Sequence, residues 1–127
     1  MSVATVLVVD DQPIVLNTLV AILTRAGFEV IPAHSARQAL RVCRDRLSPI
    51  AVALVDVVMP EISGLEVQAL LRTEFPALPV LLMSGYPLDG IALRAENGAD
   101  FLPKPFTPRT LVDRIWAVIG ENPPRTT

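Results

Sequence analysis

Several apolar runs of this chain end in acidic, hydroxyl or basic side chains that suit phosphate and metal chemistry. Asp10 and Asp11 close the first run, and Asp56 closes a second. Ser84 closes a third, and Lys104, the single lysine of the chain, follows a short fourth. If these runs are parallel strands of one sheet, their polar groups emerge together at the carboxyl edge, where open α/β sheets bind ligands.

Three neighbouring carboxylates repel one another unless one is protonated or a cation joins them. A hard divalent ion resolves this, and Mg²⁺ suits the site best when a phosphate and waters complete its octahedron. Lys104 adds a point charge for a carboxylate or phosphoryl oxygen, and Ser84 adds a hydroxyl donor. Each residue alone is typical of a turn or helix cap, but together they predict a phosphoryl-transfer site in which Asp56 can attack phosphorus.

Apolar runs alternate with amphipathic stretches along the chain. The runs predict strands at about 5–9, 28–31, 51–55, 80–83 and 100–102. The amphipathic stretches predict helices at about 13–26 and 88–97, and three more that begin near residues 35, 63 and 107. Continuous apolar strands between helices are typical of a parallel sheet that is covered on both faces.

Local signals indicate where several of these helices begin and end. Gly27 is expected to stop the first helix. Ser35 and Ser63 each precede a Gln or Glu by three residues, which is the spacing of a capping box. Thr107 is expected to cap the last helix, because proline follows it at the first helical position.

Length and composition indicate one domain, which we expect over residues 1–120, with a tail at 121–127. The 127 residues, of which 51% are hydrophobic, are enough for a real core. The net charge of -2 and the lack of a long basic stretch argue against direct nucleic-acid binding. The basic cluster has the spacing of a solvated helix face and consists of Arg37, Arg41, Arg44 and Arg46.

The remaining composition predicts a location in the cytoplasm. Cys43 is the sole cysteine, so an internal disulfide is excluded, and a reducing compartment fits. No segment is long and apolar enough to span a bilayer, and the start of the chain lacks the features of a signal peptide. We therefore expect no membrane contact.

The motifs at the strand ends match those of a known family in order and spacing. They are Val8-Val9-Asp10-Asp11, Val55-Asp56-Val57-Val58-Met59-Pro60 with Gly64, Met83-Ser84-Gly85 and Lys104-Pro105-Phe106. As a set, over about Thr5 to Ile119, they resemble the receiver domains of two-component response regulators. The sequence around Ser84 and Lys104 is most similar to that of receivers attached to hybrid sensor kinases.

The resemblance implies a flavodoxin-like α/β fold, with a five-stranded parallel sheet in the order 2-1-3-4-5 and five helices on both faces. It also implies that Asp56 is the phosphoacceptor. Asp11 and Asp56, with the backbone carbonyl of Val58, would bind Mg²⁺, and Asp10 would act mostly through water.

The resemblance further implies how the domain switches and what it binds. Ser84 and Lys104 would contact the phosphoryl group, Phe101 would hold the aromatic switch position, and the Lys104–Pro105 bond would be cis. A histidine kinase or histidine phosphotransfer protein would be the donor. A downstream partner would bind the surface of the fourth helix, fifth strand and fifth helix.

Two positions depart from the family pattern. Val58 stands two residues after the phosphoacceptor, where a polar residue is common. Phe101 lacks the hydroxyl that a tyrosine would carry. Neither change removes an essential group, but both bear on the rate and readout of switching.

Two other functions compete with a phosphorylation-controlled binding module. A hydrolase of the haloacid-dehalogenase type also combines Asp, Ser, Lys and Mg²⁺. It typically places its nucleophile after the first strand with a second acid two residues later, whereas here Asp56 follows the third strand and Val58 stands at that second position. A degenerate receiver that is never phosphorylated is the third reading, and the intact acidic, hydroxyl and lysine positions argue against it.

Overall fold

The computed structural model describes residues 3–46, 49–85 and 101–120. Its strands are β1 (Thr5–Val9), β2 (Glu29–Ala33), β3 (Val52–Asp56), β4 (Val80–Ser84) and β5 (Phe101–Pro103). Its helices are α1 (Pro13–Arg25), α2 (Ala36–Asp45), α3 (Gly64–Glu74) and α5 (Pro108–Ile119). The strands form one parallel sheet in the order β2-β1-β3-β4-β5, which confirms the expected topology.

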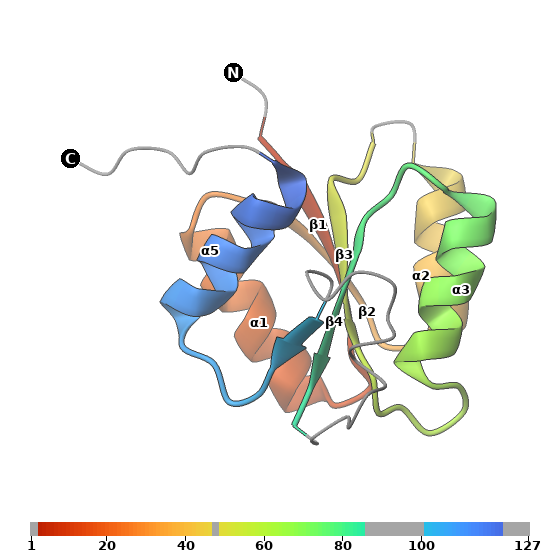
Figure 1. Cartoon of the computed structure of the whole chain (residues 1–127), viewed down its shortest axis with the longest axis horizontal. Coiled ribbons are helices and arrows are strands. Elements are labelled where there is room, and N and C mark those ends of the chain that lie inside the picture. The colour runs from red at the N-terminus through yellow and green to blue at the C-terminus, as the bar shows by residue number, and fades with distance from the viewer. Residues whose placement is uncertain (1–2, 47–48, 86–100, 121–127) are drawn as a thin grey trace.

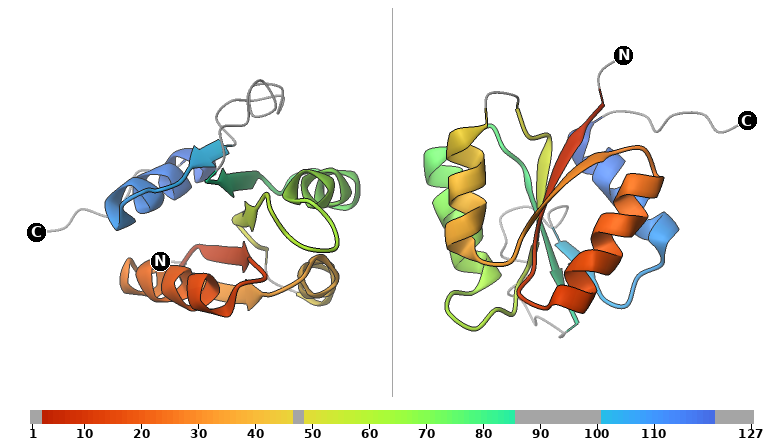
Figure 2. Two further views of the ribbon diagram at one scale, coloured as in Figure 1. Left: turned by 90° about the horizontal axis from the view of Figure 1, so that it is seen from below. Right: turned by 180° about the vertical axis from the view of Figure 1, so that it is seen from behind.

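Helices cover both faces of the sheet. α1 and α5 lie on one face, and α2 and α3 lie on the other (Figure 1). Figure 2 shows the same three layers from below and from behind. The expected helix at 88–97 and the tail at 121–127 lie outside the described residues. No helix of the described part has the length and apolar character needed to cross a bilayer.

The core is divided in two by the sheet. Successive side chains of a strand point to opposite faces, so each central strand supplies both halves. Val8 and Leu54 pack toward α1 and α5, whereas Leu7 and Val55 pack toward α2 and α3. All residues of β1, β3 and β4 are buried, as expected for parallel strands covered on both sides.

The second strand begins and ends later than its apolar run indicated. It spans Glu29–Ala33 instead of 28–31. Phe28 is buried before the strand, with its ring centroid 4.8 Å from that of Trp116 in α5. Pro32 continues the strand because β2 is an edge strand that pairs with β1 alone. A missing backbone donor is tolerated on the open side of such a strand.

The helix ends follow the expected signals with one exception. Gly27 has φ +98° and follows Ala26, the C-cap of α1, and Ser63 forms the complete capping box of α3. At α2 the Ser35 hydroxyl accepts the Gln38 backbone N–H at 3.1 Å. The Gln38 side chain, however, accepts the backbone N–H of His34 at 2.7 Å instead of that of Ser35. The prediction of a complete capping box at α2 is therefore wrong.

The last three strands and the cap of the last helix lie close to their expected positions. β3 and β4 each run one residue farther than expected and so include Asp56 and Ser84. β5 is displaced by one residue from its expected position. Thr107 caps α5 as expected, with its hydroxyl accepting the Thr110 N–H at 3.1 Å.

Arg37, Arg41 and Arg44 of α2 are exposed, as expected for a solvated face, whereas Arg46 follows the helix and is partly buried. Arg44 forms an ion pair with Glu74 of α3, and Arg46 forms one with Glu29 of β2. Cys43 of the same helix is a free, half-buried thiol, and burial raises its pKa above the ordinary value. The two ion pairs therefore link α2 and its C-cap to α3 and β2.

Candidate functional site

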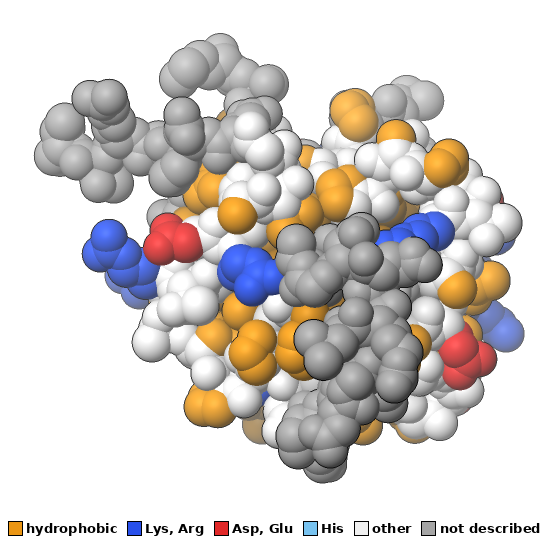
Figure 3. Space-filling view, in the orientation of Figure 1, with side chains coloured by type: hydrophobic (Ala, Val, Ile, Leu, Met, Phe, Trp, Pro, Cys, Tyr) orange, Lys and Arg blue, Asp and Glu red, His pale blue; other side chains and the backbone are white. Residues whose placement is uncertain are grey.

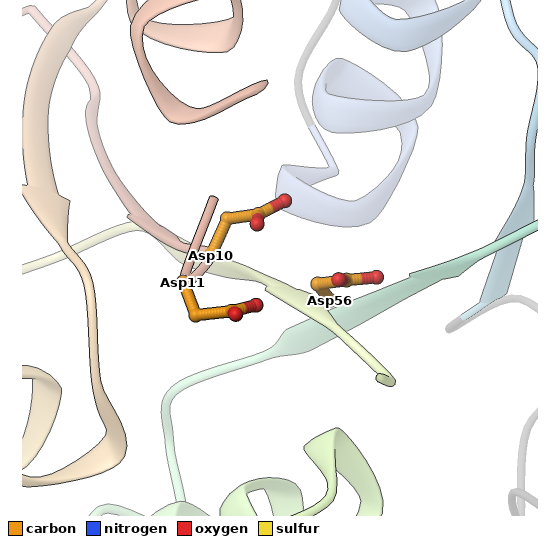
Figure 4. A group of neighbouring side chains, drawn as sticks. All are labelled: Asp10, Asp11 and Asp56. Atoms are coloured by element: carbon orange, nitrogen blue, oxygen red, sulfur yellow. The ribbon is translucent and has the colours of Figure 1, made fainter. Parts of the chain in front are cut away.

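Three carboxylates meet at the carboxyl edge of the sheet. Asp10 and Asp11 follow β1 directly, and Asp56 is the last residue of β3, the neighbouring strand. One carboxylate oxygen from each lies within 4.8 Å of the others, and Figure 4 shows the side chains next to one another. The parallel register thus brings together acids that are 45 residues apart or more in the sequence.

Asp10 is the most deeply buried of these acids, with 1% of its surface exposed. Its Oδ1 accepts the backbone N–H of Gln12 at 2.9 Å. Its Oδ2 is buried and has no hydrogen-bond partner within the described residues. A buried carboxylate oxygen without a donor is unfavourable by itself, so it favours a site that receives a cation or water.

Burial also governs the acidity of the site. It raises the pKa of Asp10 above the ordinary value, against the lowering effect of the Gln12 N–H. Burial likewise raises the pKa of Asp56, against the lowering effects of Lys104 and of the Val58 N–H, which bonds to its carboxylate. Both carboxyls are therefore harder to ionise than an ordinary aspartate.

Lys104 reaches the site from the segment after β5. Its Nζ lies 3.4 Å from Oδ1 of Asp56. Its backbone N–H donates to the carbonyl of Ser84 at 2.7 Å, which fixes its main chain against the end of β4. The bond to Pro105 is cis, as the family resemblance implied.

The other expected site residues surround this group. Ser84 ends β4 and is 1% exposed. Phe101 begins β5, pairs with Leu82 of β4, and packs against the core under α2 and α3. The Val58 side chain is half exposed just beyond Asp56. The expected site residues thus lie at the carboxyl edge of the sheet, except Phe101, which begins β5 two residues before that strand ends.

Two features of this edge were not predicted. The first is the close approach of Gly64 to the backbone of Asp56, described below. The second is an apolar groove of about 540 Å³ beside the site. It is lined by Ile14, Val15, Thr18, Leu19, Ile22, Gly85, Lys104, Pro105 and Phe106.

The sequence held a signal for this groove. Ile14 lies off the core-facing stripe of α1 and is 81% exposed, and it borders other apolar side chains of the groove. Figure 3 shows hydrophobic side chains at the surface in the region that α1 and β5 occupy in Figure 1. On the same face, the lysine and arginine side chains of the described residues lie apart from one another.

A comparison with known families matches residues 6–116 to the response regulator receiver domain. The chain belongs to this family. It is a receiver domain of the kind used in phosphorylation-switched, two-component signalling. The expected fold and the expected family are therefore both confirmed.

Individual receivers give the range of the similarity. The transcriptional regulatory protein CpxR of Escherichia coli is 39% identical over 119 residues, which cover 92% of this chain and 50% of CpxR. The structure of a receiver domain protein from Clostridium thermocellum superposes with a TM-score of 0.85 at 29% identity, covering 93% of this chain and 95% of that one. The receiver domain of the hybrid histidine kinase CckA gives a TM-score of 0.77 at 29% identity, covering 91% and 99%.

These matches include both a transcriptional regulatory protein and the receiver of a hybrid histidine kinase. The chain spans about half the length of the curated relatives it matches. The similarity to receivers of hybrid kinases therefore stays a prediction.

Proposed function

We propose that Asp56 accepts a phosphoryl group in the presence of Mg²⁺, and that the phosphorylated domain presents an altered binding surface. The setting of the Asp56 carboxylate supports this most directly. It is 6% exposed, with the Lys104 ammonium 3.4 Å away and two further acids beside it. Negative charge that develops on a transferring phosphoryl group would be neutralised by the Lys104 ammonium and by a cation that the acids would hold.

The acid cluster fits a magnesium ion. Asp11 and Asp56, with the backbone carbonyl of Val58, would hold it, and Asp10 would act mostly through water. The side-chain donors are all carboxylate oxygens, and the unpartnered Oδ2 of Asp10 gives a buried acceptor for a bound water. When bound, Mg²⁺ would neutralise negative charge on the phosphoryl oxygens.

The chain's own groups account for the transfer. An Asp56 carboxylate oxygen forms a bond to phosphorus while the bond from phosphorus to the donor's imidazole nitrogen breaks, and the imidazole keeps that electron pair. Lys104 and Ser84 contact the phosphoryl oxygens. Later attack by water on phosphorus would release phosphate and restore the carboxylate. The product that matters is the changed surface, so we regard the protein as a signalling domain and not as an enzyme.

Switching would run through Ser84 and Phe101. A phosphoryl group on Asp56 would draw the Ser84 hydroxyl inward and allow the Phe101 ring to rotate. Ser84 is buried at the end of β4, and Phe101 lies on the adjacent strand. A ligand shifts such an equilibrium only through a contact that differs between the two states. The downstream partner would bind the surface formed by the fourth helix, β5 and α5.

The phosphoryl donor would be a histidine kinase or a histidine phosphotransfer protein. The apolar groove between α1 and the segment after β5 supports this, because it runs up to Lys104 and Gly85 at the acceptor. A donor helix with an apolar face could lie in it and bring its histidine to Asp56. We propose no direct contact with nucleic acid or membrane, and a cytoplasmic location.

Mass spectrometry tests the acceptor. The protein is incubated with Mg²⁺ and acetyl phosphate, and its intact mass is measured. One phosphoryl group should add to the wild type and none to Asp56→Asn. Asp113→Asn, which changes an exposed acid of α5, should label like the wild type. Equal labelling of the Asp56 variant would refute the assignment.

A further inference from the structure

We propose that Gly64 is a positioning residue for Asp56. Because it has no side chain, the first residue of α3 packs directly on the backbone of the phosphoacceptor. This inference rests on the proposed role of Asp56. It concerns how the fold places that carboxylate and not what the carboxylate does.

The approach of Gly64 to this backbone leaves no room for a methyl group. A Cβ on Gly64 would lie 2.4 Å from the carbonyl oxygen of Asp56 and 2.7 Å from Cα of Val57. Both are main-chain atoms, which cannot rotate away as a flexible side chain can. Gly64 does not have a positive φ, so its backbone conformation would suit other residues. Glycine is needed here for space alone.

The two packed elements are each fixed by other bonds. The Gly64 N–H donates to the Val57 carbonyl at 2.8 Å, and the Val57 N–H donates to the Met83 carbonyl of β4 at 2.9 Å. The start of α3 is held by the capping box of Ser63 and Glu66. A side chain at position 64 would therefore have to displace either a capped helix start or the end of β3.

Displacement of β3 would directly change the position of the Asp56 carboxylate. The Asp56 side chain extends from the same residue whose carbonyl meets Gly64, and its Oδ1 lies 3.4 Å from Nζ of Lys104. A shift of ~1 Å in a reacting group can cost a factor of about 100 in rate. The small size of residue 64 thus sets the distance between the acceptor and its neighbours.

A matched pair of variants tests the proposal. Gly64→Ala adds the obstructing methyl group, whereas Ser63→Ala removes the helix cap next to it and adds nothing near Asp56. Phosphorylation by acetyl phosphate is followed by intact mass at saturating Mg²⁺ and donor, and folding is checked by circular dichroism and urea unfolding. We expect Gly64→Ala to label at least about 10-fold more slowly than wild type and Ser63→Ala to stay within about 2-fold. Equal rates in the two variants would overturn the proposal, because the loss would then follow helix stability.

A measurement on the wild type decides the matter if Gly64→Ala does not fold. Hydrogen exchange is compared with and without Mg²⁺ and beryllofluoride, a mimic of the phosphoryl group. Exchange at the Gly64 amide should slow several-fold more than at Leu71 in the same helix, and equal slowing would overturn the proposal. Absence of labelling in the wild type would instead refute the role of Asp56, and this inference would fall with it.

Discussion

At the scale of single residues, burial opposes the ionisation of the two buried acids of the site. Burial raises the pKa of Asp10 and of Asp56, so their ionised forms are less favourable in the folded state than in the unfolded chain. For a carboxyl whose folded pKa is raised, the contribution to stability is greatest below the unfolded pKa. It is lost as pH rises through the folded pKa. At neutral pH without metal, these acids therefore oppose folding.

Asp10→Asn should raise the melting temperature at about pH 7 when divalent ions are removed, by roughly 3 °C or more. The amide keeps an acceptor for the Gln12 N–H but carries no charge. The difference from wild type should be smaller at about pH 4 than at pH 7, because a carboxyl with a raised pKa is increasingly protonated as the pH falls. Thermal unfolding in EDTA at both pH values measures this, and a lower melting temperature for the variant at pH 7 would contradict it.

Val58 bears on the lifetime of the phosphorylated state. Its half-exposed side chain lies beside the acceptor and cannot bond to an attacking water. Val58→Asn should speed the loss of the phosphoryl group about 10-fold, which corresponds to ~1.4 kcal/mol of barrier. Loss is followed by mass or radiolabel. Val58→Ala is the control, because it opens space without adding a polar group. A similar acceleration in both variants would show that access matters and polarity does not.

At the scale of elements, β5 is a three-residue edge strand held from α5. The Arg114 guanidinium donates to the Phe101 carbonyl at 2.7 Å. Arg114→Gln should loosen β5, so that exchange at the Lys104 amide, which bonds to Ser84, becomes ~5-fold faster for the loss of about 1 kcal/mol. Arg109→Gln, on the exposed side of the same helix, should leave that exchange unchanged. If the two variants behave alike, the Arg114 bond does not stabilise the strand.

The elements show what sequence patterns can and cannot predict. Apolar runs placed most strand ends within one or two residues, because burial on both faces demands such runs. The run around Phe28 misled because that ring packs on Trp116 outside the strand. The spacing of Ser35 and Gln38 allowed a reciprocal cap, but the His34 N–H took the glutamine oxygen. Spacing shows which groups can meet, whereas tertiary contacts decide which do.

At the scale of the whole molecule, stability depends on filling both halves of the core. Leu54 is fully buried in the central strand. Leu54→Ala should lower the free energy of unfolding by about 2–5 kcal/mol. Leu70→Ala, on the outer side of α3, should cost less than ~1 kcal/mol, because Leu70 is 44% exposed. Urea unfolding of both proteins measures the difference, and similar losses would contradict this account of the core.

The site was easier to predict than the strand order. Parallel strands that alternate with helices must end at one edge, so the strands themselves placed Asp10, Asp11 and Asp56 along that edge. The order of those strands came from the family resemblance, because periodicity does not show which strands are neighbours. The role proposed for Gly64 depends on contact with a segment eight residues away and has no local pattern.

The use of arginine everywhere but at position 104 has a practical consequence. Lysine labelled with ¹⁵N would enter these 127 residues at one position, so the side-chain spectrum would hold one signal. That signal would come from an ammonium group 3.4 Å from Asp56. Arginine guanidinium groups stay protonated and chemically distinct from amines. Isotope labelling of a single amino acid would thus report on the acceptor directly.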